Sequence, residues 1–153
     1  MSKICKICLN NDILCQVCNA NLESGKITLI EVGISRILHK LGIGADFVKA
    51  VERGMIYILA DKKNARLLIG RNGRNSKKLE AELKKKVRII ENTEEKDVIE
   101  SVLGTDIIGI NILYSPKEKY RIRVQRIFRN RIKNEHLLAL NALLGKDYEV
   151  VIE

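Results

Sequence analysis

The amino-acid sequence predicts a mixed α/β protein in which a small cysteine module precedes two consecutive units of similar architecture. All four cysteines lie within the first eighteen residues. A pattern of helix, two strands, helix, glycine turn, helix and strand follows over residues 27–92. Much of this pattern returns over residues 93–153. We therefore expect a module at 1–24, a first unit at 27–92 and a second unit at 93–153.

Length and composition are those of a folded protein. The 153 residues suffice for one ordinary domain or two small ones, and 46% of them are hydrophobic. The N-terminus is polar, and no apolar run approaches the roughly 20 residues needed to cross a bilayer. We therefore expect an intracellular, cytoplasmic protein. Aromatic residues make up only 4% of the chain, which argues against a surface of stacked aromatic platforms.

The cysteines form two Cys-x-x-Cys pairs, Cys5 with Cys8 and Cys15 with Cys18, separated by six residues. Each pair makes a tight turn that directs two sulfurs to one point, and four thiolates suit a tetrahedral Zn²⁺ site. Because four protein ligands close the coordination shell, we expect one structural zinc ion and no zinc catalysis. Two disulfides or a redox pair are the alternatives; a reducing cytosol disfavours the first, and the second belongs in a βαβ unit. The polar residues 19–26 are interpreted as a linker.

The first unit is predicted to begin with an amphipathic helix over residues 27–41, whose isoleucines and leucines recur at helical spacing. Gly42 is expected to end it. A β-hairpin should follow, with strands at 47–51 and 55–60 joined by a turn at 52–54.

The stretch that organises the first unit is a glycine turn, Gly70-Arg71-Asn72-Gly73, between helices predicted at 62–69 and 75–85 and before a strand at 87–90. Two residues without Cβ allow positive φ and a close approach of the backbone to a sugar-phosphate chain. The following helix offers free N–H groups and the positive end of its dipole to phosphate. The alternative is a plain helical hairpin with a solvated basic face. The residues expected to contact nucleic acid are Gly70, Arg71, Asn72, Gly73, Arg74, Lys77 and Lys78.

Positive charge is concentrated in two segments of a chain whose formal net charge is +9. Residues 62–88 hold eleven Lys or Arg against two Glu, and residues 117–133 hold eight against one. The rest of the chain is acidic. A basic patch on such a body is typical of a polyanion binder. It does not indicate a membrane surface, because no amphipathic helix combines a basic face with large aromatic side chains.

The second unit is predicted to contain a helix at 94–103, strands at 108–114 and 120–125, a helix at 132–144 and a closing strand at 148–152.

The second unit lacks the glycines. The corresponding residues are Ile132-Lys133-Asn134-Glu135. Without glycine their backbone cannot easily adopt the conformation of the glycine turn, and the carboxylate of Glu135 would repel phosphate. We therefore expect a degenerate, structural unit. Arg121 and Arg123 alternate along a predicted strand and are candidate phosphate contacts, the alternative being a solvated strand face. The turn before that strand is placed at Ser115-Pro116-Lys117-Glu118.

The order of strand, helix, Ile-Gly-x-x-Gly, helix and strand resembles a KH domain. This resemblance implies a module for RNA or other single strands whose glycine loop clamps about four nucleotides. The preceding helix and hairpin match the type II topology. Two such units over residues 27–153 resemble the tandem KH pair of NusA-type transcription factors, especially the archaeal NusA-like proteins. The motifs that carry the resemblance are LLIGRNGRNSKKLE, KKVRIIE with EEKDVIESVL, and IIGINILYS.

The resemblance implies a transcription elongation or termination factor that grips single-stranded RNA, with RNA polymerase as a partner. A ribosome-associated protein that holds ribosomal RNA is the alternative, because small, very basic, zinc-bearing chains are common there. The cysteine module or the second unit could also dock a protein. We expect neither an enzyme nor a small-molecule substrate, since His39 and His136 lie far apart and no Ser/His/Asp or paired-carboxylate motif is present.

Overall fold

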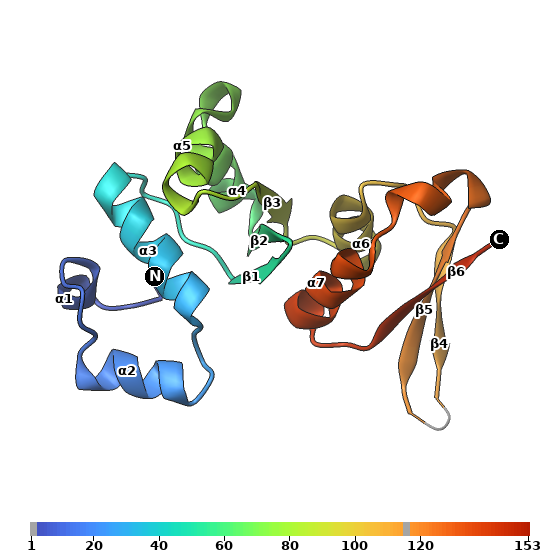
Figure 1. The fold of residues 1–153 in the computed structure, drawn as a ribbon, viewed down its shortest axis with the longest axis horizontal. Helices are drawn as coiled ribbons and strands as arrows, with labels where there is room; N and C mark the ends of the chain where they lie inside the picture. Colours follow the sequence, from blue (N-terminus) through green and yellow to red (C-terminus); the bar gives the residue numbers. More distant parts are fainter. Residues whose placement is uncertain (1–2, 115–116) are drawn as a thin grey trace.

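A computed structural model describes residues 3–114 and 117–153, so Ser115 and Pro116 of the predicted turn lie outside the described residues. The N-terminal module contains α1 (Lys6–Leu9) and α2 (Gln16–Glu23). The first unit contains α3 (Leu29–Leu41), β1 (Lys49–Arg53), β2 (Met55–Ala60), α4 (Lys62–Ile69), the 3-10 turn η1 (Arg71–Gly73), α5 (Arg74–Leu83) and β3 (Val87–Glu91). The second unit contains α6 (Glu95–Leu103), β4 (Gly109–Leu113), β5 (Lys119–Val124), the 3-10 helix η2 (Arg126–Arg131), α7 (Asn134–Leu144) and β6 (Tyr148–Ile152) (Figure 1).

Each unit carries a three-stranded sheet, and the two sheets have the same topology. The strand orders are β1-β2-β3 and β4-β5-β6. In both, the first two strands form an antiparallel hairpin and the third strand runs parallel to the middle one. The predicted fold class, a mixed α/β protein with two consecutive units of similar topology behind a cysteine module, is therefore confirmed.

The first unit begins with a reciprocal helix cap. Thr28 Oγ1 accepts a hydrogen bond from the Glu31 backbone N–H at 3.3 Å, and Glu31 Oε1 accepts one from the Thr28 N–H at 2.9 Å. The other oxygen of this buried carboxylate accepts from the Ala50 N–H at 3.2 Å. One side chain thus starts α3 and fastens it to β1.

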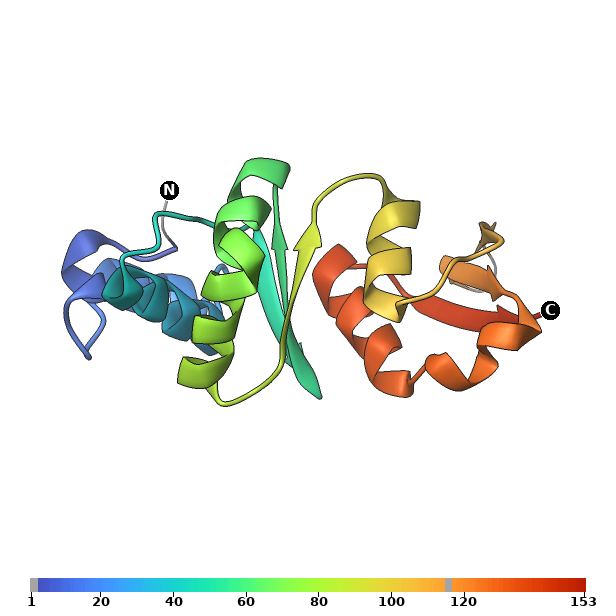
Figure 2. The same cartoon turned by 90° about the horizontal axis from the view of Figure 1, so that it is seen from above.

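Helices cover both faces of the first sheet. Along β2, Ile56 and Ile58 pack with α3, α4 and α5, whereas Tyr57 and Leu59 pack with α6 and α7. These last two helices also cover one face of the second sheet through Ile122, so they lie between the two sheets (Figures 1 and 2). The two units therefore share one hydrophobic core.

Polar contacts fix α6 in this position. Arg88 on β3 donates from Nη1 to the carbonyls of Ser101 and Val102 at 3.2 and 3.0 Å, which satisfies carbonyls at the end of α6. At the other end of the helix, Glu95 accepts from the Tyr148 hydroxyl at 2.6 Å and pairs with Lys146 at 3.1 Å.

One prediction about the elements was wrong. Residues 19–23 are helical and not part of a linker, because the Cys15 sulfur caps α2 by accepting from the Cys18 N–H and Leu22 packs into the module core. No element was predicted for residues 126–131, which form η2 where the first unit has an α-helix, and α7 begins at Asn134, two residues after its predicted start. Within 3–114 and 117–153, none of the helices has the length and apolar character that a bilayer span requires.

Candidate nucleic-acid interface and metal centre

The loop between α4 and α5 has the backbone conformation that its glycines were predicted to permit. Gly70 adopts φ 74° and ψ 176°, a region that is essentially restricted to glycine. Gly73 adopts the left-handed conformation at φ 74° and ψ 15°. Asn72 between them is also left-handed, at φ 56°, which asparagine tolerates better than most residues. The chain therefore makes an abrupt, outward-facing turn at this point.

Asn75 holds the loop closed, and sequence reasoning missed it. Its Nδ2 donates to the carbonyl of Leu67 at 2.7 Å, near the end of α4. A Cβ built on Gly70 would lie 2.8 Å from Asn75 Cγ, so the glycine is needed for space as well as for its conformation. Ser76 adds a second contact, donating from Oγ to the Gly73 carbonyl at 3.1 Å.

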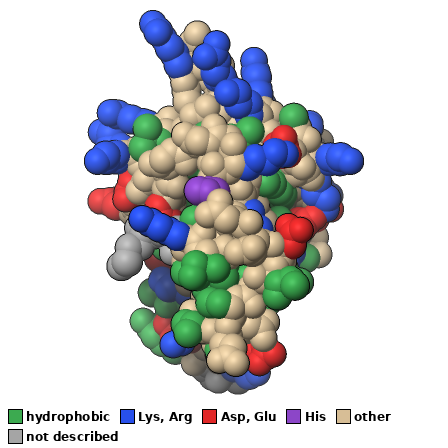
Figure 3. Space-filling view, turned by 90° about the vertical axis from the view of Figure 1, so that its left-hand side faces the viewer, with side chains coloured by type: hydrophobic (Ala, Val, Ile, Leu, Met, Phe, Trp, Pro, Cys, Tyr) green, Lys and Arg blue, Asp and Glu red, His purple; other side chains and the backbone are tan. Residues whose placement is uncertain are grey.

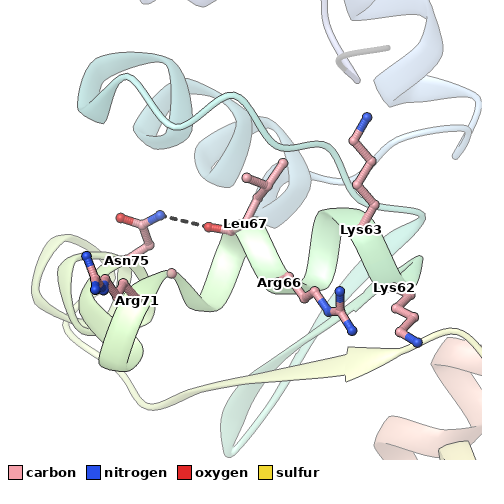
Figure 4. A pocket seen from close by; sticks show the side chains of 7 residues that line it. Lys62, Lys63, Arg66, Leu67, Arg71 and Asn75 are labelled. Carbon is pink, nitrogen blue, oxygen red and sulfur yellow. Dashed lines mark hydrogen bonds between the residues drawn. The ribbon is translucent and has the colours of Figure 1, made fainter.

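A groove of about 650 Å³ opens beside the loop along α4. It reaches from Lys62 at the start of the helix to Arg71 and Asn75 beyond its end (Figure 4). Leu67, which is 41% exposed, supplies an apolar surface inside it. The residues that line the groove are Lys62, Lys63, Arg66, Leu67, Gly70, Arg71 and Asn75. Of these, only Gly70 and Arg71 were predicted from the sequence to contact nucleic acid. The i, i+4 spacing of Lys63 and Leu67 indicates that these two side chains share one face of the helix.

A second hollow of about 500 Å³ adjoins the loop and is lined by Arg71, Asn72, Arg74 and Lys77. Four predicted contact residues therefore meet at one place, while Lys78 is exposed but lines neither hollow. Within the described part of the chain, no Lys or Arg between residues 62 and 78 forms an ion pair. Lys and Arg side chains gather at the upper end of the molecule, where the loop lies (Figures 1 and 3). Their charge is available to an anionic ligand.

Arg121 and Arg123 do not join this surface. They lie on β5, on the face of the second sheet that points away from α6 and α7. Arg121 Nε pairs with Glu149 at 2.9 Å, and Arg123 Nη1 lies 3.8 Å from a carboxylate oxygen of Glu153. Both partners sit on or beside the neighbouring strand β6, so each arginine already has an anionic neighbour.

The residues that replace the glycine loop in the second unit face the first unit. No residue from Ile132 to Glu135 has a positive φ. The Glu135 carboxylate rests against Gly54 in the turn between β1 and β2, where a Cβ would collide with it. This segment is therefore part of the contact between the two units.

The four cysteine sulfurs form a compact cluster. All lie within 4.8 Å of one another, with Cys5 and Cys8 at 3.4 Å and Cys5 and Cys15 at 3.9 Å, and none is in a disulfide. A tetrahedron of thiolates around zinc, with Zn–S bonds of about 2.3 Å, has sulfur–sulfur edges of roughly 3.8 Å. The donor set and its spacing thus fit a four-coordinate, thiophilic metal ion.

Electrostatics in the cluster favour a cation. The backbone N–H of Cys18 and the neighbouring thiols lower the pKa of Cys15 to about 7. For Cys8, the N–H of Cys15 lowers the pKa, but burial and the other three thiols outweigh it and raise the pKa to about 12. Crowded thiols cannot all ionise alone, so a metal cation would be needed to hold four thiolates together.

The module is docked on α3. Arg36 Nε donates to the Cys8 carbonyl at 3.2 Å, and His39 Nε2 lies 2.9 Å from Asn10 Oδ1. Ile4 and Ile27 complete a small core with the buried cysteines. His39 therefore has a structural partner.

No family model and no curated protein matches the chain. Among solved structures, the one described as the crystal structure of APE1850 is similar, with a TM-score of 0.63 and 23% sequence identity. The match covers 83% of this chain and 100% of that chain. At this level of identity the similarity shows a shared fold.

Proposed function

We propose that the chain is a single-stranded RNA-binding protein of the NusA-like, tandem KH class that acts during transcript elongation or termination. The conformation of Gly70 carries the proposal. Its backbone is bare and sharply turned at the edge of a groove that four cationic side chains line. A loop of this kind lets a sugar-phosphate chain lie directly against the protein backbone.

The loop and the groove bind different parts of the RNA. Arg71, Arg74 and Lys77 around the loop attract the phosphates and set most of the affinity, which carries little sequence information. Unpaired bases would then rest in the groove against the exposed side chain of Leu67. The cytoplasm is the compartment in which such a protein meets its transcript and RNA polymerase.

Replacing Arg71 and Asn72 by Asp should abolish binding of a random-sequence single-stranded RNA, measured by fluorescence anisotropy, and leave thermal unfolding unchanged. Both side chains are exposed, so the substitution adds negative charge without disturbing the core. The matched control is Lys96→Asp with Asn92→Asp, which makes the same change in formal charge at exposed positions around the start of α6.

Wild-type affinity should fall with salt at a log–log slope of about −0.7 for each phosphate contact. If the loop variant bound RNA as tightly as the wild type, or if both variants lost binding equally, the loop would not be the binding site.

The same interface would serve a ribosome-associated protein that holds ribosomal RNA. The combination of a cysteine module with a net charge of +9 favours this second candidate. Cofractionation from cell extract separates the two, since a transcription factor follows RNA polymerase and the alternative follows ribosomes.

We infer that the metal ion of the cysteine cluster is one structural Zn²⁺, held by Cys5, Cys8, Cys15 and Cys18. Four thiolate ligands leave no coordination site for water, which excludes a catalytic role for such an ion. We assign no enzymatic activity to the chain.

A further inference from the structure

A third hollow, of about 490 Å³, lies where the two units meet. Its first-unit wall comes from the turn before β2 and from the start of β3, which contributes Lys86 and Arg88. Its second-unit wall comes from the end of η2 and the first turn of α7, which contribute Arg131, Lys133 and His136. None of these residues belongs to the loop described above.

The charges in this cleft are unbalanced. Four cationic side chains face one carboxylate, that of Glu135. Over residues 3–114 and 117–153, none of the four cations is in an ion pair. Arg88 is held by the carbonyls at the end of α6, and the Arg131 guanidinium stacks over the Phe128 ring at 5.5 Å. Two guanidinium groups are therefore positioned before any ligand arrives.

His136 adds a hydrogen-bond donor. Its Nδ1 accepts from the Lys133 backbone N–H at 3.1 Å, which leaves the hydrogen of the neutral ring on Nε2. Burial, together with the charges of Arg88 and Lys133, lowers the pKa of His136, so the ring is neutral at physiological pH when the cleft holds no anion. Tyr57, only 1% exposed, forms part of the wall.

We propose that the cleft between the two units binds a phosphate group, supplied either by the backbone of an RNA strand or by a free nucleotide. Guanidinium groups pair with phosphate oxygens in a bidentate manner, and lysines add point charges. The Glu135 carboxylate, which rests against Gly54, limits the affinity. This site goes beyond the proposed function, because it uses different residues and does not require the glycine loop.

The test is a titration of the full chain with inorganic phosphate, followed through the ring signals of His136 by NMR. Bound phosphate should raise the pKa of His136 measurably. Lys86→Gln with Lys133→Gln should weaken phosphate binding about fivefold, since two cations are lost. Lys117→Gln with Lys119→Gln is the matched control: it removes the same charge at exposed positions outside the cleft and should leave binding unchanged.

Glu135→Gln gives a test in the opposite direction. It preserves the shape of the side chain and removes the one carboxylate among the described residues that line the cleft, so phosphate should bind about twofold or more tightly. A gain in affinity cannot arise from misfolding, which keeps the proposal testable if the lysine variant proves unstable.

Repeating the titration with single-stranded RNA and with AMP identifies the source of the phosphate. A response to RNA indicates the strand backbone, and a response to AMP alone indicates a free nucleotide. The Arg71→Asp/Asn72→Asp variant should still bind phosphate in the cleft, so this result is independent of the loop. No change at His136 with any of the three ligands, or equal weakening by the cleft and control variants, would overturn the proposal.

Discussion

Gly70 and Gly73 both have positive φ, yet the structure requires glycine at them for different reasons. At Gly70 the pair of angles lies in a region that other residues hardly enter, and Asn75 fills the space where a Cβ would be. At Gly73 the backbone is in the ordinary left-handed region, and the nearest atom to an added Cβ is Ser76 Oγ at 3.7 Å. One position is restricted by shape and conformation, the other by conformation alone.

Gly70→Ala should therefore cost more stability than Gly73→Asn. We expect a loss of about 1–3 kcal/mol for the first, together with weaker RNA binding as the loop distorts. For the second we expect a loss below about 1 kcal/mol, because asparagine tolerates the left-handed conformation. Urea unfolding and RNA anisotropy on both variants check this. Equal losses would mean that the contact with Asn75 does not restrict Gly70.

At this scale the sequence predicts what depends on local chain geometry. The four loop residues could be named because glycine spacing alone determines which backbone conformations are open to the turn. Asn75 could not, because its role depends on a hydrogen bond between the start of one helix and the end of another. Lys62 and Arg66 share a face of α4 through their i, i+4 spacing, but that spacing does not show that this face borders a groove beside the loop.

Among the elements, α1 and α2 depend most on something other than their own residues. They are short, and their core consists largely of Ile4, Ile27 and the cysteines themselves. Removing a bound metal should therefore unfold the module while the two units stay folded. Metal analysis should find one zinc ion per chain, and a strong chelator should reduce helical circular dichroism in one step and release that ion.

Binding of the metal should also weaken as the pH falls, because protons compete for the thiolates. Cys8→Ser should lose the ion, whereas Ser24→Ala, an exposed change just after α2, should retain it. Purified protein without metal but with the module intact would contradict the zinc assignment.

The elements were predicted with uneven success. The strands, β6 among them, were predicted because alternating and continuous apolar runs mark strands, whereas their order within each sheet was not predicted. The 3-10 helix at 126–131 was not predicted. Only Ile127 and Phe128 in this arginine-rich segment are apolar, so it shows no helical spacing of apolar residues. The extension of α2 was missed because its polar residues resemble a linker, and the sulfur cap at Cys15 becomes visible only in three dimensions.

For the whole molecule, two similar units were predicted, but not how they meet. The apolar run of β2 indicates a strand buried on both faces, as parallel sheets require. It does not say that α6 and α7 supply the second cover while also covering the other sheet. That arrangement places Glu135 and its neighbours in a contact between units, and no residue from Ile132 to Glu135 adopts the positive φ that would require glycine there.

Because helices cover both faces of β2, this strand should be the last part of the protein to unfold locally. Deuterium should replace the amide hydrogens of β2 more slowly than those of β5, although both are middle strands, because β5 is covered by helices on one face only. Mass spectrometry of peptides that span the two strands gives the comparison. Faster labelling of β2 than of β5 would mean that α6 and α7 detach readily from the first sheet and that the two units separate transiently.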